Sequence, residues 1–412
     1  MRPSGLQMSL LPTNLQPRQP SNVSLLPRRE KVPRSEVASQ ERTDGLLARL
    51  QGIDWNFPLS DEAATIHAIH PYPAKFISDI PRALIRELGV LDGSGVLDPF
   101  CGCGTTLAVA QELGVPSVGV DLNPIACLIS RVKTMPLPEG FLLAAQEVAF
   151  AAAETTTWSV PLVPNVAHWF DLVVQRAVTA TVEAISRQSD AMIREHLRAA
   201  LSSILVRVSR QESDTRYAAV DKNVSFRGTL EQFVNACFRL ARAKEFQVAD
   251  ARALVIERNI LEVTPEMIPI PISLVITSPP YPNAYEYWLY HKYRMWWLGY
   301  DPLAVKEREI GARAHYFKKN HATYDEFIVQ MRQVLRLTWN ILIDGGYACF
   351  VLGRSRIHGI DVDNASMIDD IARDEGFEHV ARLRRAIAST RKSFNLSHAR
   401  IKTEDIVILR KP

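Results

Sequence analysis

The stretch Ser278-Pro279-Pro280-Tyr281 contains residue types that can hold and orient an amine. It follows the apolar run Leu274–Ile276, which predicts a strand, so we expect it at that strand's carboxyl end. The two prolines fix the backbone and remove its N–H donors, which leaves carbonyl groups at fixed positions. The carbonyl of Pro279 and the hydroxyl of Ser278 can accept both hydrogens of an aryl amine, and Tyr281 can stack on a flat substrate ring. A purely structural turn is the alternative.

A glycine-containing turn, DPFCGCGTT, lies upstream at positions 98–106. The apolar residues before it predict a strand that brings Asp98 to the carboxyl edge of a sheet, where open α/β sheets bind ligands. Gly102 and Gly104 carry no side chain and let a ligand approach the backbone. Leu107 stands where the dinucleotide pattern GxGxxG requires a third glycine, and no GxxxxGK[ST] sequence occurs. Asp98 therefore suits a cationic amino group better than a phosphate.

Two further acidic residues are predicted to follow strands. Asp121 lies in VGVDLNP (118–124), about twenty residues after the glycine turn, where a carboxylate can accept both hydroxyls of a ribose. Asp250 follows the predicted strand 247–249 and can accept from an adenine amino group. With Asp98, these acids fit S-adenosylmethionine, whereas ATP does not fit because no motif here cradles phosphates. The alternative, that each acid only caps the following helix, stays open.

The segments between these turns predict an α/β fold, a seven-stranded Rossmann-like sheet. The predicted strands are Val96–Pro99, Ser117–Leu122, Gln247–Ala249, Ser273–Thr277, Gly346–Leu352, Val380–Ala386 and Ile406–Leu409. Helices are predicted at Pro81–Leu88, Thr105–Leu113, Pro124–Lys133, Tyr324–Leu342 and Met367–Glu375.

The chain divides by composition into an arm, a split domain and an insertion. Residues 1–45 hold six prolines and no apolar periodicity, which predicts a flexible arm. Residues 65–134 and 246–412 form the predicted α/β domain. Residues 135–245 interrupt it as a helical insertion, a candidate target-recognition region, with helices at Val173–Ile185 and Met192–Val208 and an exposed loop at 209–228.

Composition excludes several classes. The chain has 412 residues, 47% hydrophobic and 23% charged, which is typical of a globular protein. No apolar run reaches the ~20 residues that span a bilayer, and no secretory leader pattern begins the sequence, so we expect a cytoplasmic protein without a membrane partner. Cys101 and Cys103 lack a second ligand pair for zinc, so no metal is expected.

Positive charge gathers near the carboxyl terminus. Positions 382–412 contain nine Lys and Arg residues against Glu404 and Asp405, although the whole chain has a net charge of only +3. This pattern is typical of a surface that contacts phosphates, and a merely solvated basic surface is the alternative. The candidate phosphate-contacting residues are Arg391, Lys392, Arg400 and Lys402.

The combination of DPFCGCGTT (98–106) and TSPPY (277–281) resembles the amino-methylating DNA methyltransferases, which act on cytosine N4 or adenine N6. HPYPAKF (70–76) resembles the segment before their first strand, and VGVDLNP resembles their ribose-binding strand end. The resemblance covers most of residues 65–412 apart from much of the insertion. Cys103 departs from it, since the family more often has Ser there.

The resemblance implies a set of site residues. Lys75 and Phe76 would lie near the methionine part of the cofactor, Asp98 would hold its amino group, Asp121 its ribose and Asp250 its adenine. The remaining implied cofactor contacts are Phe100, Gly102, Gly104, Thr105, Asn123 and Ala251. The implied catalytic residues are Ser278, Pro279, Pro280 and Tyr281.

The expected function is therefore site-specific methylation of duplex DNA from S-adenosylmethionine, with base flipping, in a restriction-modification or defence context with companion proteins. SPPY in the family goes more often with cytosine N4, and DPPY with adenine N6. Adenine-N6 methylation and guanine-N2 methylation of RNA are the enzymatic alternatives. A DNA-binding protein that has lost turnover is the non-enzymatic one.

Overall fold

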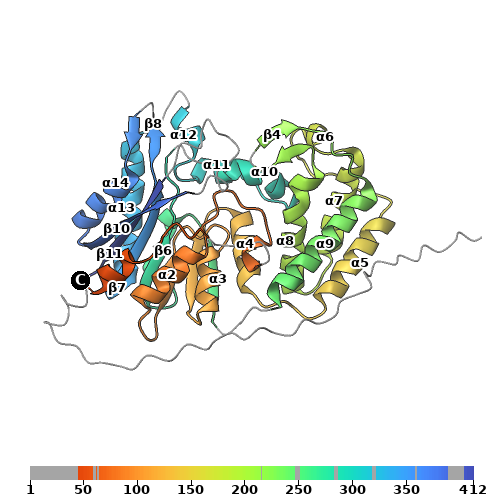
Figure 1. Cartoon of the computed structure of the whole chain (residues 1–412). Helices are drawn as coiled ribbons and strands as arrows, with labels where there is room; N and C mark the ends of the chain where they lie inside the picture. The colour runs from red at the N-terminus through yellow and green to blue at the C-terminus, as the bar shows by residue number, and fades with distance from the viewer. Residues whose placement is uncertain are drawn as a thin grey trace, which may run out of the picture. The chain divides into compact units, whose positions relative to one another are not determined.

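The computed structural model of the protein describes residues 45–58, 62, 65–214, 216–245, 251–282, 286–317, 322–357, 360–387 and 403–412. These residues belong to one compact unit, in which helices flank a sheet and a bundle of helices packs beside it (Figure 1). The predicted arm, 1–45, lies almost wholly outside the described residues.

The sheet has seven strands in the order β10-β11-β7-β6-β1-β2-β5, which confirms the predicted fold class. All neighbours pair in parallel except β11, which runs antiparallel to both β7 and β10. The strands are β1 (Gly95–Asp98), β2 (Ser117–Asp121), β5 (Ala253–Glu257), β6 (Ile272–Thr277), β7 (Leu342–Gly353), β10 (Glu378–Ala386) and β11 (Thr403–Arg410). The predicted third strand, 247–249, lies outside the described residues, and β5 takes that place in the sheet.

Helices cover both faces of the sheet because successive strand residues point to opposite sides. Val96 and Leu274 pack in the same apolar cluster as α2 and α3, whereas the next residues, Leu97 and Val275, pack with α13 and α14. Both faces are therefore buried, as the near-continuous apolar runs of the central strands require. These helices are α2 (Asp79–Leu88), α3 (Thr105–Glu112), α13 (Tyr324–Ile341) and α14 (Asn364–Asp374).

The insertion is a helical bundle that shares a core with the α/β domain. Its elements are α5 (Phe141–Glu154), α6 (Val166–Trp169), α7 (Leu172–Ser186), α8 (Ala191–Val208), β3 (Gln211–Ser213), β4 (Arg216–Ala219) and α9 (Phe226–Lys244). The segment 209–228, predicted as a loop, thus contains a β-hairpin and the start of α9. The two short strands of this hairpin do not alternate apolar and polar residues, so the sequence pattern that predicts strands is missing here.

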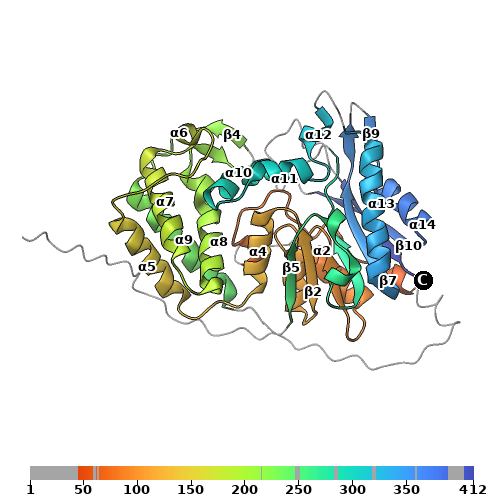
Figure 2. The ribbon, with the colours of Figure 1, turned by 180° about the vertical axis from the view of Figure 1, so that it is seen from behind.

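Three elements after the SPPY turn connect the bundle to the sheet: α10 (Tyr287–Trp297), α11 (Pro302–Arg308) and α12 (Arg313–Phe317). Helices α10 and α11 cross from one to the other in both views (Figures 1 and 2). Arg294 of α10 is 1% exposed and donates to the carbonyl of Ser202 and to the carboxylate of Asp214. This buried arginine joins α8 and the β3–β4 hairpin to the segment that follows the SPPY turn.

Two further elements follow central strands of the sheet. The helix α4 (Pro124–Thr134) follows β2, and a small hairpin, β8 (Ser355–Ile357) with β9 (Ile360–Val362), follows β7. Within the described ranges, no helix has the length and apolarity needed to cross a membrane.

Gly104 offers a test of the packing that positions the glycine turn. Its φ is +74°, and a Cβ there would lie 2.7 Å from Ser130 Oγ of α4. Gly104→Ala should lower the free energy of unfolding by roughly 2–4 kcal/mol, because left-handed strain adds to the steric overlap. Chemical denaturation measures this loss.

Gly140→Ala is the matched control, since Gly140 also precedes a helix with φ +72° but has no atom within 4 Å of its added Cβ. It should cost only about 1 kcal/mol. Equal losses in the two variants would show that α4 does not pack against the glycine turn as described.

Candidate active site

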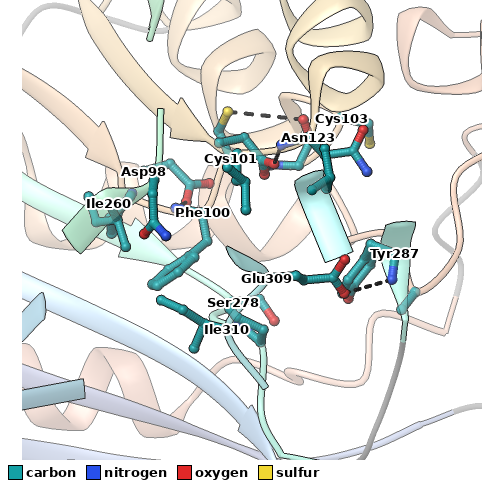
Figure 3. A pocket seen from close by; sticks show the side chains of 18 of the residues that line it. Asp98, Phe100, Cys101, Cys103, Asn123, Ile260, Ser278, Tyr287, Glu309 and Ile310 are labelled. Carbon is teal, nitrogen blue, oxygen red and sulfur yellow. Dashed lines mark hydrogen bonds between the residues drawn. The ribbon is translucent and has the colours of Figure 1, made fainter. Parts of the chain in front are cut away.

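The carboxyl ends of β1, β2, β5 and β6 surround one pocket of about 910 Å³, part of which is open to solvent (Figure 3). This is where a doubly wound sheet is expected to bind a ligand. Many of the residues predicted from sequence line it together. These are Phe76, Asp98, Phe100, Gly102, Thr105, Asp121, Asn123, Ser278 and Pro280.

Asp121 fixes the loops on either side of it. Its Oδ2 accepts from the backbone N–H of Gly102 at 2.9 Å, and its Oδ1 accepts from that of Asn123 at 2.8 Å. Ser130 Oγ donates to the carbonyl of Gly102 at 2.7 Å. The glycine turn is therefore held from both its N–H and its carbonyl, and φ +50° at Gly102 explains why glycine stands there.

Asn123 begins α4 and also faces the pocket. Its Oδ1 accepts from the N–H of Ile125 at 3.0 Å and caps the helix, with Pro124 at the first helical position. Its Nδ2 is buried and has no hydrogen-bond partner among the described residues. A buried donor without a partner is costly, so this amide is suited to a ligand acceptor.

Asp98 is 3% exposed and is also held by its neighbours. Its Oδ1 accepts from the N–H of Phe100 at 3.1 Å, and its Oδ2 accepts from Thr106 Oγ1 at 2.7 Å. Burial raises the pKa of Asp98 to about 6, and burial likewise raises the pKa of Asp121 to about 6. Two carboxylates that are costly to ionise in the same pocket favour a cationic ligand.

The SPPY turn forms the opposite wall. Ser278 Oγ donates its hydrogen to the carbonyl of Val351 in β7 at 3.2 Å. The hydroxyl therefore keeps its lone pairs for accepting hydrogen bonds. Pro279 and Tyr281 are not among the residues that line the pocket, and Tyr281 packs instead against the apolar cluster that includes Phe327.

Other predicted site residues are not brought to this pocket. Lys75 forms an ion pair with Glu62 at 2.5 Å and donates to the carbonyl of His67 at 3.2 Å. The carbonyl of Ala251 accepts from Gln111 Nε2 at 3.1 Å, and neither Ala251 nor Gly104 lines the pocket. Asp250, Arg391, Lys392, Arg400 and Lys402 lie outside the described residues.

The pocket includes residues that were not singled out from the sequence. Tyr72 and Ala74 line it with Phe76, so alternate residues of HPYPAKF face inward. Arg258, Asn259 and Ile260 also line the pocket, because they directly follow the end of β5 at Glu257. Glu309 also lines the pocket. It lies in a run of charged residues, and no sequence pattern distinguishes it from its neighbours.

Residues 30–131 match the family model described as "DNA methylase", N6_N4_Mtase. The type II methyltransferase M.MjaII of Methanocaldococcus jannaschii is 40% identical over 87 residues, 20% of this chain and 16% of that protein. The type II methyltransferase M.BsoBI of Geobacillus stearothermophilus is 24% identical over 281 residues, 59% of this chain and 54% of that protein. The chain thus spans about half, or less, of these relatives' length.

Among solved structures, the rRNA methyltransferase aviRa from Streptomyces viridochromogenes resembles the chain with a TM-score of 0.32 and 13% identity, over 85% of this chain and 93% of that one. The resemblance predicted from the motifs is confirmed: residues 30–131 match the DNA methylase model, and longer stretches of the chain are similar to type II methyltransferases. Its relatives are enzymes that depend on S-adenosylmethionine, the cofactor predicted from the sequence.

The raised pKa of Asp98 generates a prediction about stability. Because its folded-state pKa of about 6 exceeds the unfolded value of about 3.9, stability from this group is complete below pH ~4 and is lost as pH rises through ~6. Asp98→Asn does not ionise and escapes this loss. Relative to wild type, the ligand-free variant should gain about 2 kcal/mol in unfolding free energy between pH ~4.5 and ~7.5. Denaturant titrations at both pH values measure the gain, and a constant difference would contradict a buried, ionising Asp98.

Proposed function

We propose that this protein transfers a methyl group from S-adenosylmethionine to the exocyclic amine of a base in duplex DNA, within a restriction-modification or defence system. One observation carries the proposal: the acidic wall formed by Asp98 and Asp121 and the oriented hydroxyl of Ser278 line the same pocket. The first suits a cationic adenosyl ligand, and the second suits an amine.

The pocket residues fit the cofactor. Asp98 would hold its amino group, and Asp121 would accept from the ribose hydroxyls through lone pairs not used by the backbone. The free Nδ2 of Asn123 would donate to the same ligand, and Phe100 with Ile260 would supply apolar surface for the adenine. When bound, S-adenosylmethionine supplies an electrophilic methyl group.

The chain's own contribution is to orient the amine. Ser278 gives its hydrogen to Val351, so its oxygen would accept one amine N–H. The motif assigns the second acceptor to the carbonyl of Pro279, a residue that does not line the pocket in the free protein. Both bonds withdraw the nitrogen lone pair from conjugation with the base. An amine held in this way needs alignment and no covalent enzyme intermediate.

Cytosine N4 is the preferred target, with adenine N6 as the alternative. The turn begins with Ser278 where a carboxylate would be the stronger acceptor. The family resemblance associates SPPY with cytosine N4, and the rest of the pocket contributes to the choice.

DNA would be held over the carboxyl edge of the sheet. The β3–β4 hairpin, α10 to α12 and the β8–β9 hairpin all lie toward this edge (Figure 1). We propose that the helical insertion, 135–245, supplies target recognition and that Arg391, Lys392, Arg400 and Lys402 contact phosphates. The described arginines of the same stretch are engaged within the fold, since Arg382 and Arg384 pair with Asp405 and Arg385 pairs with Glu404. The reading of sequence and the neutralisation of the backbone would then come from separate parts of the chain.

The direct test is identification of the methylated nucleoside. Labelled S-adenosylmethionine is incubated with unmethylated PCR-amplified DNA and, in parallel, with transcribed RNA, and each is digested for mass spectrometry. The proposal expects N4-methylcytosine from DNA. N6-methyladenine would reverse the choice of base, N2-methylguanine from RNA alone would replace the substrate, and cofactor binding without any product would indicate a protein that has lost turnover.

Asp121→Ala should weaken S-adenosylmethionine binding at least about tenfold, because the ribose loses a charged acceptor and the Gly102 turn loses its anchor. Glu257→Gln is the control, since Glu257 lies opposite Asp121 on β5 but does not line the pocket. Calorimetry measures both affinities. Wild-type affinity in Asp121→Ala would remove this residue from the cofactor site.

Ser278→Ala should lower kcat roughly 100-fold while the cofactor Kd stays within about threefold of wild type. The reason is that the hydroxyl is proposed to contact the amine and not the cofactor. Single-turnover methyl transfer and calorimetry separate the two quantities. Unchanged turnover would exclude Ser278 from the reaction.

A further inference from the structure

The SPPY motif does not supply an aromatic ring to the lining of the pocket. Tyr281 packs against an apolar cluster, whereas Tyr287, six positions later at the start of α10, lines the pocket. The ring of Tyr287 stacks on that of Tyr72 at 6.0 Å between centroids. Tyr72 also lines the pocket and contacts the glycine turn at Gly102. Tyr287 therefore belongs to the wall that a flat substrate ring would meet.

The first turn of α10 lacks a cap of its own. Glu286, the residue at the N-cap position, makes no side-chain hydrogen bond to the helix. The cap comes instead from Glu309, which lies just after α11. Its Oε1 accepts from the N–H of Tyr287 at 2.8 Å, as Figure 3 shows, and its Oε2 accepts from the N–H of Trp288 at 2.8 Å. Charged acceptors at a helix start are among the stronger stabilising contacts, so Glu309 fixes where α10 begins.

The segment 308–311 that carries Glu309 is itself attached to both sides of the pocket. The carbonyl of Arg308 accepts from Asn259 Nδ2 at 3.2 Å, beyond the end of β5. At Gly311, with φ +73°, an added Cβ would lie 3.3 Å from the backbone of Tyr281. The segment that carries Glu309 therefore contacts both the residues after β5 and the SPPY turn, and these two contacts fix the position of Glu309.

Burial raises the pKa of Glu309 to about 8, and the nearby carboxylates of Asp121 and Glu286 add to this rise, opposed by the two N–H groups of α10. Arg258, Arg308 and Asp98 also line the pocket. The pKa of Asp98 and that of Asp121 are raised only to about 6, so these two are largely ionised at neutral pH. A neutral carboxyl accepts more weakly than a carboxylate, which makes the cap on α10 weaker below pH ~8.

We propose that Glu309 is a positioning residue for the target base: by accepting the two N–H groups that begin α10, it holds the ring of Tyr287 in the pocket as the aromatic wall against which the base lies. This inference rests on the proposed methyl transfer and adds to it a residue outside the SPPY motif. Base stacking on an aromatic side chain is sequence-tolerant and is worth enough to hold an extruded base.

Glu309→Gln tests the inference, because glutamine keeps one acceptor and presents an amide to the other N–H group. With PCR-amplified unmethylated DNA as substrate at pH 9, where the wild-type Glu309 carboxyl is ionised, kcat should fall about 10- to 100-fold, and the difference from wild type should shrink toward pH 7. The Kd for S-adenosylmethionine should stay within about threefold, since Asp98 and Asp121 are unchanged. The matched control is Glu307→Gln, an exposed glutamate of α11 two residues away, which should behave as wild type. Tyr287→Ala should show the same pattern as Glu309→Gln, whereas Tyr287→Phe should retain activity.

The pH profile separates positioning from a general loss of structure. Wild-type kcat should rise from about pH 7 to about pH 9 as the Glu309 carboxyl ionises, whereas Glu309→Gln should be flat over the same range. If Glu309→Gln does not fold, Glu309→Asp decides, because a shorter carboxylate should restore the pH-dependent rise and part of the rate. Wild-type kcat and an unchanged profile in Glu309→Gln would overturn the inference. A wild-type protein that methylates no DNA would instead overturn the proposed function.

Discussion

The pocket depends on one carboxylate that is shared between two loops. Asp121 accepts from the N–H of Gly102 on one side and from that of Asn123 on the other, so the turn after β1 and the turn after β2 hold a fixed separation. Gly104 lets α4 approach closely, and Ser130 of that helix holds the carbonyl of Gly102. These contacts keep an acidic edge open at the end of a sheet that is otherwise covered on both faces.

That acidic edge is costly to the free protein and useful to a cationic ligand. Burial raises the pKa of Asp98, of Asp121 and of Glu309, which means that each resists ionisation in the fold. A ligand that carries positive charge relieves this cost when it binds. Buried charged groups of this kind lower the stability of the free protein, and such a loss of stability is common at sites that bind a charged ligand. Ser278 on the facing wall carries no charge, so its burial has no ionisation cost, and its hydroxyl oxygen can accept a hydrogen bond from an uncharged amine.

Much of the fold could be predicted because its signals are local. The central strands are short apolar runs, and β1, β2, β6, β7, β10 and β11 lie where their runs indicate. The glycine turn and the SPPY turn follow strands directly, which places both at one edge of the sheet. Local sequence patterns did not identify the strand β5 or the pocket residues that follow it. β5 begins at Ala253, so the residues that follow its carboxyl end into the pocket are Arg258 and Asn259, whereas Asp250 lies outside the described residues.

Glu309 and Lys75 are two residues whose contacts could not be predicted from local sequence patterns. Glu309 caps a helix that begins 22 positions earlier, and no local pattern links a glutamate to backbone N–H groups that distant. Lys75 lies in a motif that faces the pocket at alternate residues, and its neighbours Ala74 and Phe76 are the ones that line it. The lysine itself pairs with Glu62, a partner that only the folded chain brings close.

A crystal structure with S-adenosylhomocysteine, the demethylated cofactor, tests the central claim most directly. The ligand should lie in the pocket between the glycine turn and the SPPY turn, with its ribose hydroxyls on Asp121, its amino group toward Asp98 and its sulfur toward Ser278. A ligand bound elsewhere on the chain, or one whose sulfur faces away from Ser278, would contradict the claim that this edge of the sheet holds the methyl donor beside the residue that orients the amine.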